Sequence, residues 1–302
     1  MSPSTAEEVS SIINQLNNKK QVRTNDVETK FFKYSKTINS PIISELFNLC
    51  TCKGIFPNCL KIAEIIPVHT KGDRNKATNY RPIALLSQFD KIFEKMIFTR
   101  LLSYLNKKNL ISNNQFGFRP NSSTDYAISM LYDKIVKNTD RGLYSCCVFV
   151  DLTKAFDTVD HKILLWKLHH CFGIRGNALS LFESYLSNRY QYTKVLDAYS
   201  SNLKTNIGVP QGSCLGPLLF LLYINDLPLY SKFDTTLYAD DTALLLSDCN
   251  ILLLERKVNH ELEKIKLWLQ NNKLSLNCSK TNYMIFNKEP HKTCHFDLKL
   301  YK

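Results

Sequence analysis

The sequence lacks any long apolar run. Its most apolar stretch, residues 218–224, ends at Asn225 and Asp226 and is too short for a bilayer, which takes about 20 residues to cross. The N-terminus has neither the basic start nor the apolar core of a signal peptide. We therefore expect an intracellular protein without a signal peptide or a transmembrane segment, and no membrane partner.

Paired cysteine motifs are also missing. The ten cysteines include no C-x-x-C pair, and Cys50, Cys52 and Cys59 lack the histidine or second close pair that a zinc site would need. Several cysteines lie inside apolar stretches, where a free thiol behaves as a small hydrophobic group. This pattern indicates a reducing compartment and predicts no zinc site.

Acidic residues are in the minority. Lys and Arg total 39 against 27 Asp and Glu, which gives a net charge of +12. Such a balance favours a polyanionic partner, with nucleic acid as the natural candidate. The alternative is a basic surface that serves only solubility. With 302 residues, 44% of them hydrophobic, the chain can bury one large core or two modest ones.

The hydrophobic periodicity predicts helices and strands that alternate irregularly, without repeats or a long linker, so the fold class is α+β. Ser4 and Glu7 have capping-box spacing ahead of a short first helix. Residues 62–68 and 80–85 predict two strands joined by a basic hairpin tip at 71–76. Ser87 caps a helix that reaches Leu105. Further helices are predicted at 124–137, 162–171, 178–186 and 251–270.

Three carboxylates follow or interrupt apolar stretches. Asp240 and Asp241 lie where a strand turns back on itself, and Asp151 follows the apolar run 146–150 (CCVFV). Most Asp-Asp pairs are solvated turns, and that interpretation applies here as well. Between apolar strands, however, like charges a few Å apart repel by about 4 kcal/mol. A hard divalent cation such as magnesium would compensate this repulsion.

Five motifs occur in one order along the chain. They are residues 79–86 (NYRPIALL), 115–119 (QFGFR), 151–160, 209–213 (VPQGS) and 238–241 (YADD). This order and spacing resembles the reverse transcriptase of non-LTR (LINE-type, jockey-like) retrotransposons, from about Phe56 to Phe286. A lone Y-A-D-D would be weak support, whereas five motifs in register are specific.

The resemblance implies a right-hand polymerase palm and fingers and an RNA-directed DNA polymerase. It implies an N-terminal helical extension and fingers entry at 1–50 and a reverse transcriptase domain at 51–302. The fingers would be mainly 51–144 and 161–205, and the palm mainly 145–160 and 206–290. The partners would be an RNA template, a DNA primer and dNTPs. Nuclear residence, alone or beside the cytoplasm, follows only from this resemblance.

The resemblance also assigns roles to single residues. Asp151, Asp240 and Asp241 would hold two Mg²⁺ ions, with Mn²⁺ as a possible substitute, during transfer of a nucleotide to the primer 3′-hydroxyl. Lys280 would protonate the leaving pyrophosphate as a general acid. Phe156 would exclude a ribose 2′-hydroxyl; the alternative is an ordinary core aromatic.

The remaining site predictions concern nucleotide and template. Arg81 and Lys71 would contact the triphosphate, and Gln211 and Gly212 would border the nucleotide pocket. The resemblance implies template or primer contacts for Arg119, Pro210 and Tyr238. Arg119 could instead be a structural ion-pair partner, and residues 209–213 could be an ordinary Pro-Gly turn before a helix that starts near Leu218.

The sequence departs from the family in two places. Residues 20–26 lack the glycine expected in the first finger loop, and after Phe286 the family continues into a primer grip and a helical thumb. We therefore expect the thumb to be absent or truncated, with no upstream endonuclease domain. The alternatives are a truncated, non-catalytic nucleic-acid-binding remnant and an RNA-directed RNA polymerase, which Phe156 disfavours.

Overall fold

The computed structural model describes residues 1–18, 23, 26–119, 122–288 and 296–299. Two compact units divide the chain: Met1–Leu110 with Asp160–Leu219, and Ile111–Val159 with Phe220–Lys302. Most of the 20–26 finger-loop segment and Cys294 lie outside the described residues. Within the described residues, no helix combines the length and apolarity that crossing a membrane requires.

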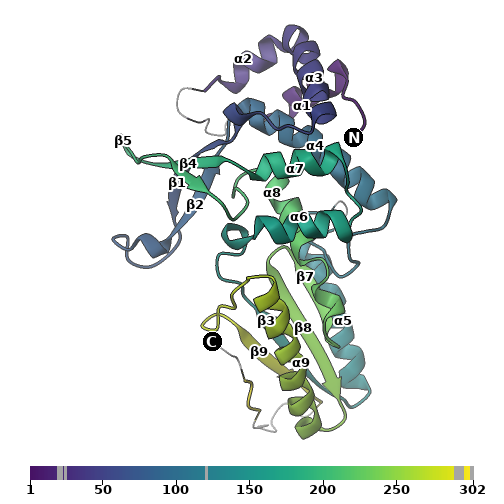
Figure 1. Ribbon diagram of the computed structural model, residues 1–302. Coiled ribbons are helices and arrows are strands. Elements are labelled where there is room, and N and C mark those ends of the chain that lie inside the picture. Colours follow the sequence, from purple (N-terminus) through teal and green to yellow (C-terminus); the bar gives the residue numbers. More distant parts are fainter. Residues whose placement is uncertain (19–22, 24–25, 120–121, 289–295, 300–302) are drawn as a thin grey trace. The chain divides into compact units, whose positions relative to one another are not determined.

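The first unit joins helices to a small sheet (Figure 1). In chain order it contains α1 (Ala6–Gln15), α2 (Thr29–Tyr34), α3 (Lys36–Lys53), the 3₁₀ turn η1 (Asn58–Leu60), β1 (Ile62–His69), η2 (Ala77–Asn79), β2 (Tyr80–Leu85), α4 (Gln88–Lys107), α6 (His161–His170), α7 (Asn177–Leu186), β4 (Arg189–Val195), β5 (Ala198–Tyr199), β6 (Leu203–Thr205) and the first half of α8 (Leu215–Ile224).

Helices α1 and α4, for which the sequence predicts N-terminal caps, both begin with a side-chain cap. Ser87 Oγ accepts the N–H of Asp90 at 3.0 Å, as the spacing predicts for α4. For α1 the predicted cap is wrong by one residue, because Thr5 Oγ1 accepts the N–H of Glu8. Ser4 instead places its hydroxyl 2.9 Å from Ser44 Oγ, a buried contact with α3 that local spacing could not show.

The sheet of the first unit has the order β2-β1-β4-β5, with β6 paired to β4. The β1–β2 hairpin is antiparallel, with Val68 opposite Arg81, while β1 and β4 run parallel. The hairpin tip projects away from the helices of this unit (Figure 1). The predicted basic hairpin is therefore confirmed, but the partner strand β4 comes from a distant part of the chain.

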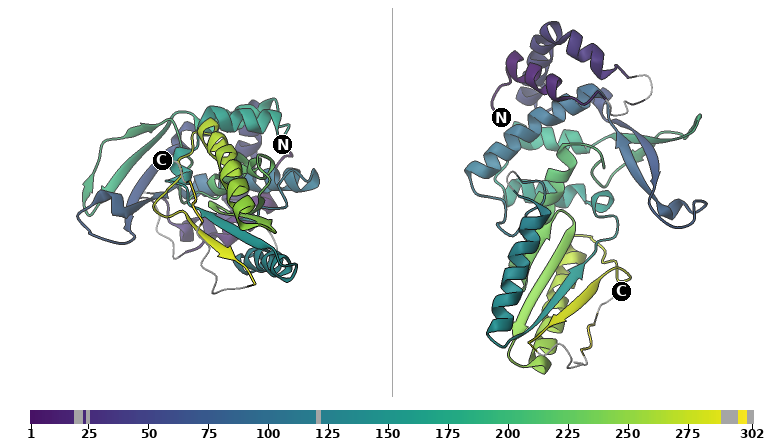
Figure 2. Two further views of the ribbon diagram at one scale, coloured as in Figure 1. Left: turned by 90° about the horizontal axis from the view of Figure 1, so that it is seen from below. Right: turned by 180° about the vertical axis from the view of Figure 1, so that it is seen from behind.

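The second unit is a four-stranded antiparallel sheet with helices on both faces (Figure 2). It contains α5 (Thr124–Asp140), β3 (Tyr144–Val150), η3 (Ala155–Thr158), the second half of α8, η4 (Leu227–Leu229), β7 (Asp234–Tyr238), β8 (Asp241–Asp248), α9 (Ile251–Asn271) and β9 (Asn282–Phe286). The strand order is β7-β8-β3-β9, so the strand that leads to Asp151 lies at the centre of the sheet.

Alternation along β3 decides which helix covers which face. Cys147 packs with Ile135 of α5 and Leu245 of β8, whereas Val150 lies against Leu262 of α9. Because successive strand residues point to opposite faces, α5 and α9 cover opposite sides of this sheet, as the two opposed views show (Figures 1 and 2). The mixed α and β content predicted from the sequence is confirmed.

Two adjacent cysteines occupy the middle of β3. Cys146 and Cys147 are both fully buried, one on each face of the sheet. Burial raises the pKa of each thiol to about 12, with Cys147 adding to the effect on Cys146. These thiols therefore behave as small core side chains. The nine cysteines in the described part of the chain are all free.

Candidate active site

The end of β3 and the start of β8 bring two of the predicted carboxylates together. Val150 pairs with Thr242, so continuing the antiparallel register places Asp151 opposite Asp241. Residues directly opposite in such a pair have Cβ atoms about 4.5–5.5 Å apart. Asp151 and Asp241 also line one cavity of about 370 Å³ in the second unit. The sheet therefore places both carboxylates at one end of its central strands.

A tight turn carries the third carboxylate. Tyr238 of β7 pairs with Asp241 of β8, so Ala239 and Asp240 form a two-residue connection. Ala239 has φ of +55°, a left-handed conformation that costs a residue with a Cβ of order 1–3 kcal/mol. Asp240 is half-buried and is not among the residues that line the cavity shared by Asp151 and Asp241.

The segment that leads into β9 fixes Asp151. Its N–H donates to Thr281 Oγ1 at 3.3 Å, and its carbonyl accepts the N–H of Asn277 at 2.8 Å. The Nζ of Lys280 lies 3.5 Å from Asp151 Oδ2. Lys280, predicted as a general acid, thus lies beside the first carboxylate and places a positive charge there.

The three carboxylates give this end of the sheet an excess of negative charge. Partial burial raises the pKa of Asp241 above its ordinary value, and the charges of Asp240 and Asp151 raise it further. Asp151 Oδ2 is buried and accepts no hydrogen bond from the residues that the structure describes. A cation would relieve both conditions.

These carboxylates fit a hard divalent cation by their chemistry, since oxygen is the donor that Mg²⁺ prefers. Across the described ranges, however, no set of three or more Asp, Glu, His or Cys side chains is arranged to hold a metal ion. The structure therefore places Asp151 and Asp241 on one cavity, and the convergence of all three carboxylates stays a prediction.

Phe156 follows Asp151 on the turn η3. Its ring centroid lies 4.7 Å from that of Phe220, with the planes tilted by 37°. The side chain is half-buried, so part of the ring is accessible. Both interpretations of Phe156 remain compatible with this placement: it packs as a core aromatic on one side and can meet a ligand on the other.

The predicted nucleotide contacts lie in the first unit. Arg81, on β2, and Lys71, at the hairpin tip, are both exposed. Residues 209–213 lie against the same strand, because the Gln211 carbonyl accepts the N–H of Ala84 at 2.6 Å. Gly212 has φ of +121°, and a Cβ there would lie 2.4 Å from the Ala84 carbonyl oxygen. The glycine is needed for this close approach.

The predicted template and primer residues differ in their surroundings. Arg119 Nη1 donates to the carbonyls of Ser112 and Gln115 at 3.0 and 3.3 Å, so it has a structural role through backbone hydrogen bonds. Tyr238 lines the cavity that contains Asp151. Pro210 is half-buried, and its carbonyl accepts the N–H of Ser213 at 3.3 Å.

A buried polar cluster in the first unit was not predicted. Glu94 is fully buried; its Oε2 accepts the N–H groups of Cys214 and Leu215, and its Oε1 accepts the Tyr185 hydroxyl at 2.5 Å. Asp90 is one turn away and equally buried. The two acidic residues at i and i+4 on the apolar face of a helix were the available sequence signal.

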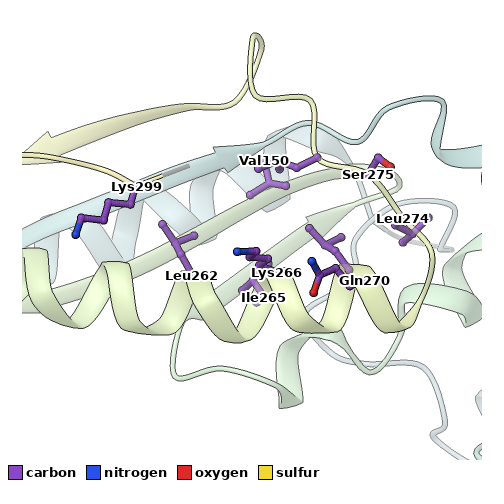
Figure 3. A pocket seen from close by; sticks show the side chains of 10 residues that line it. Val150, Leu262, Ile265, Lys266, Gln270, Leu274, Ser275 and Lys299 are labelled. Carbon is purple, nitrogen blue, oxygen red and sulfur yellow. The ribbon is translucent and has the colours of Figure 1, made fainter. Parts of the chain in front are cut away.

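A second cavity of the second unit, about 200 Å³, lies between α9 and the sheet (Figure 3). Leu262, Ile265 and Val150 form apolar walls, while Lys266 and Lys299 contribute the charged groups. Among the described residues, no acidic side chain lines it. Its chemistry therefore does not suit a divalent cation, and the cavity beside Asp151 remains the candidate site.

Comparison with known proteins identifies the family of this chain. Residues 69–296 match the family described as Reverse transcriptase (RNA-dependent DNA polymerase). The probable RNA-directed DNA polymerase from transposon BS of Drosophila melanogaster is 32% identical over 247 residues, which is 78% of this chain and 27% of that protein. The RNA-directed DNA polymerase from mobile element jockey of the same species is 29% identical over 296 residues, 95% of this chain and 32% of that protein.

The chain thus spans about a third or less of the length of these relatives. A third relative, the probable RNA-directed DNA polymerase from transposon X-element of Drosophila melanogaster, is 28% identical over 81% of this chain and 27% of that protein. The predicted resemblance to jockey-like retrotransposon enzymes is confirmed. The chain belongs to the reverse transcriptase (RNA-dependent DNA polymerase) family.

Proposed function

We propose that this chain is the catalytic region of an RNA-directed DNA polymerase of a non-LTR retrotransposon, adding dNTPs to a primer 3′-hydroxyl on an RNA template. The observation that supports the proposal is the cavity at the end of β3 and β8 that both Asp151 and Asp241 line, in a chain of the reverse transcriptase family. The excess negative charge there suits a substrate that arrives with magnesium.

The domain assignment is part of this proposal. The fingers would be mainly 51–144 and 161–205, the palm mainly 145–160 and 206–290, and 1–50 an N-terminal extension. The compact units divide the chain elsewhere, since 111–144 lies with β3 and 206–219 lies with the β1–β2 hairpin. The palm sheet that we propose is β7-β8-β3-β9.

Asp151, Asp240 and Asp241 would hold two Mg²⁺ ions, which Mn²⁺ could replace. When bound, these ions would lower the pKa of the primer hydroxyl and neutralise the triphosphate. Lys280 lies beside Asp151. An ion bound by Asp151 would neutralise that carboxylate and free Lys280, which would then donate its proton to the leaving pyrophosphate.

The remaining residues would bind and select the substrate. Arg81 and Lys71 would contact the triphosphate, the first through a bidentate guanidinium. Gln211 and Gly212 would present their loop to the nucleotide. Phe156 would exclude the ribose 2′-hydroxyl and so select deoxynucleotides.

The template and primer path would include Arg119, Pro210 and Tyr238. Arg119 would act by holding the backbone of residues 112–115 in shape. Tyr238 would act from the cavity beside Asp151.

The test is primer extension on poly(rA)/oligo(dT) with magnesium and dTTP. We expect extension by the parent chain and a loss of at least about 100-fold in Asp151→Asn and Asp240→Asn, because each change removes charge that the transition state needs. Asp234→Asn is the matched control: it makes the same chemical change at the other end of β7, where Asp234 pairs with Lys134.

Near-normal extension by Asp151→Asn or Asp240→Asn would refute the assignment. A parent chain that binds the duplex with steep salt dependence but extends no primer would support the non-catalytic nucleic-acid-binding alternative.

A further inference from the structure

The segment that precedes Gly117 lies along the edge of β7. The N–H of Leu237 donates to the Asn114 carbonyl at 2.8 Å, and the N–H of Phe116 donates to the Leu237 carbonyl at 2.8 Å. These bonds form a parallel bridge between Gln115 and Leu237, on the strand that pairs with β8 along its other edge. The start of the QFGFR motif therefore forms an isolated bridge to the edge of the sheet that carries the carboxylates.

The side chain of Gln115 reaches the turn itself. It is only 2% exposed, and its Oε1 accepts the N–H groups of Gly117 at 2.7 Å and of Ala239 at 3.2 Å. Its Nε2 has no hydrogen-bond partner among the described residues, so the side-chain amide acts here only as a hydrogen-bond acceptor, through Oε1. Ala239, buried and left-handed, directly precedes Asp240.

Gly117 allows this contact. A Cβ at Gly117 would lie 2.3 Å from the backbone nitrogen of Ala239, closer than real Cβ atoms approach. Both residues are thus matched to the backbone of Ala239: Gln115 accepts its N–H, and Gly117 has no side chain that would collide with it.

From this arrangement we propose that Gln115 is a positioning residue for the Asp240–Asp241 turn. It accepts the Ala239 N–H and so keeps the left-handed residue, and the carboxylate that follows it, in one conformation. An amide oxygen suits the task better than a carboxylate, because Glu would add a negative charge beside Asp240 and Asp241. The proposal depends on the proposed function only for its effect on catalysis.

The experiment compares Gln115→Met with Ser145→Ala in the full chain. Met preserves the length of the side chain and removes the acceptor. Ser145→Ala deletes a partly buried hydrogen bond, the 2.7 Å contact with Ser247 at the opposite end of the same sheet. It therefore controls for a general loss of stability.

Three measurements are made on each protein. Amide exchange of Ala239 by NMR should be at least ~10-fold faster in Gln115→Met than in Ser145→Ala, because its buried N–H loses its acceptor. Broadening of the Asp240 and Asp241 amides by Mn²⁺ should need at least ~3-fold more ion. In primer extension, kcat should fall at least ~10-fold with the dTTP KM within about twofold.

Ala239 exchange that matches Ser145→Ala would overturn the proposal. Faster exchange with unchanged Mn²⁺ broadening would overturn it too, because the turn would then be loosened without consequence for the carboxylates. If the parent neither binds Mn²⁺ nor extends primer, the proposed function fails, and Ala239 exchange alone decides whether Gln115 fixes the turn.

Discussion

Replacing Asp241 with asparagine should make the metal-free protein more stable while abolishing the proposed activity. Asp241 lines the same cavity as Asp151, at the end of β3 and β8, and directly follows Asp240. The pKa of its carboxyl is raised by partial burial and by both of those charges. Asparagine keeps the shape of the side chain and removes the charge.

The magnitude follows from the cross-strand geometry. Carboxylates about 6 Å apart repel by about 0.7 kcal/mol at the dielectric of water and by about 2.8 kcal/mol at an effective dielectric of 20. Asp241 is exposed, and Lys280 Nζ offsets part of the charge of Asp151. We therefore expect a gain near the low end, about 1 kcal/mol, which raises the Tm by roughly 2–4 °C.

The gain should depend on pH with a definite sign. Because the pKa of Asp241 is higher in the folded than in the unfolded chain, stability is lost as the pH rises through the folded pKa. The advantage of asparagine should be absent near pH 3 and complete by about pH 7. Adding magnesium should reverse the order, because an ion at tenfold its Kd stabilises the parent by about 1.4 kcal/mol.

Thermal denaturation in EDTA at both pH values, repeated with magnesium, provides the assay. A lower Tm for Asp241→Asn in EDTA at neutral pH, or an equal gain at acid pH, would refute the reasoning from charge repulsion. Asp234→Asn serves as the control, since its carboxylate is paired with Lys134 at 2.6 Å and should show no such gain.

Three further changes test other parts of the molecule. Phe156→Val should lower discrimination between dNTP and rNTP by at least about tenfold in incorporation assays; an unchanged ratio would leave only a packing role for this ring. Gly212→Ala should lower the free energy of unfolding by about 2 kcal/mol or more in urea, because its Cβ would lie 2.4 Å from the Ala84 carbonyl oxygen at a φ of +121°; an unaltered midpoint would mean that the loop can relax. Burial, and then the charge of Glu94, raise the pKa of Asp90 well above its usual range, so its contribution to stability is lost as the pH rises through that raised value. Asp90→Asn should flatten this fall in the denaturation midpoint with rising pH, and a pH curve parallel to that of the parent would contradict it.

Local patterns predicted the elements that carry the site. The apolar run ending at Asp151 is β3, and the YADD motif lies at the β7–β8 turn, as predicted. Helix α9 was expected at 251–270 and spans Ile251–Asn271. These three predictions are correct because the apolar pattern and the residues that end each element lie within a few residues of each other in the chain.

What the sequence did not predict depends on distant contacts. Helix α3 has Pro41 near its start and exposes Ile38 and Ile42 while burying Ile43 and Phe47, so no single apolar face marks it. The bridge from Gln115 to β7 joins positions more than 100 residues apart, as does the contact of Glu94 with the start of α8. Periodicity along the chain holds no information about such pairs.

The two adjacent free thiols at the centre of β3, Cys146 and Cys147, can report how often the second unit opens. Because burial raises the pKa of both thiols to about 12, Cys146 and Cys147 are protonated at neutral pH, and neither can meet a reagent while the strand stays covered. Alkylation of these two positions therefore requires that β3 be exposed. Timing their labelling by mass spectrometry would report how often this strand, and the carboxylate at its end, leaves the native arrangement.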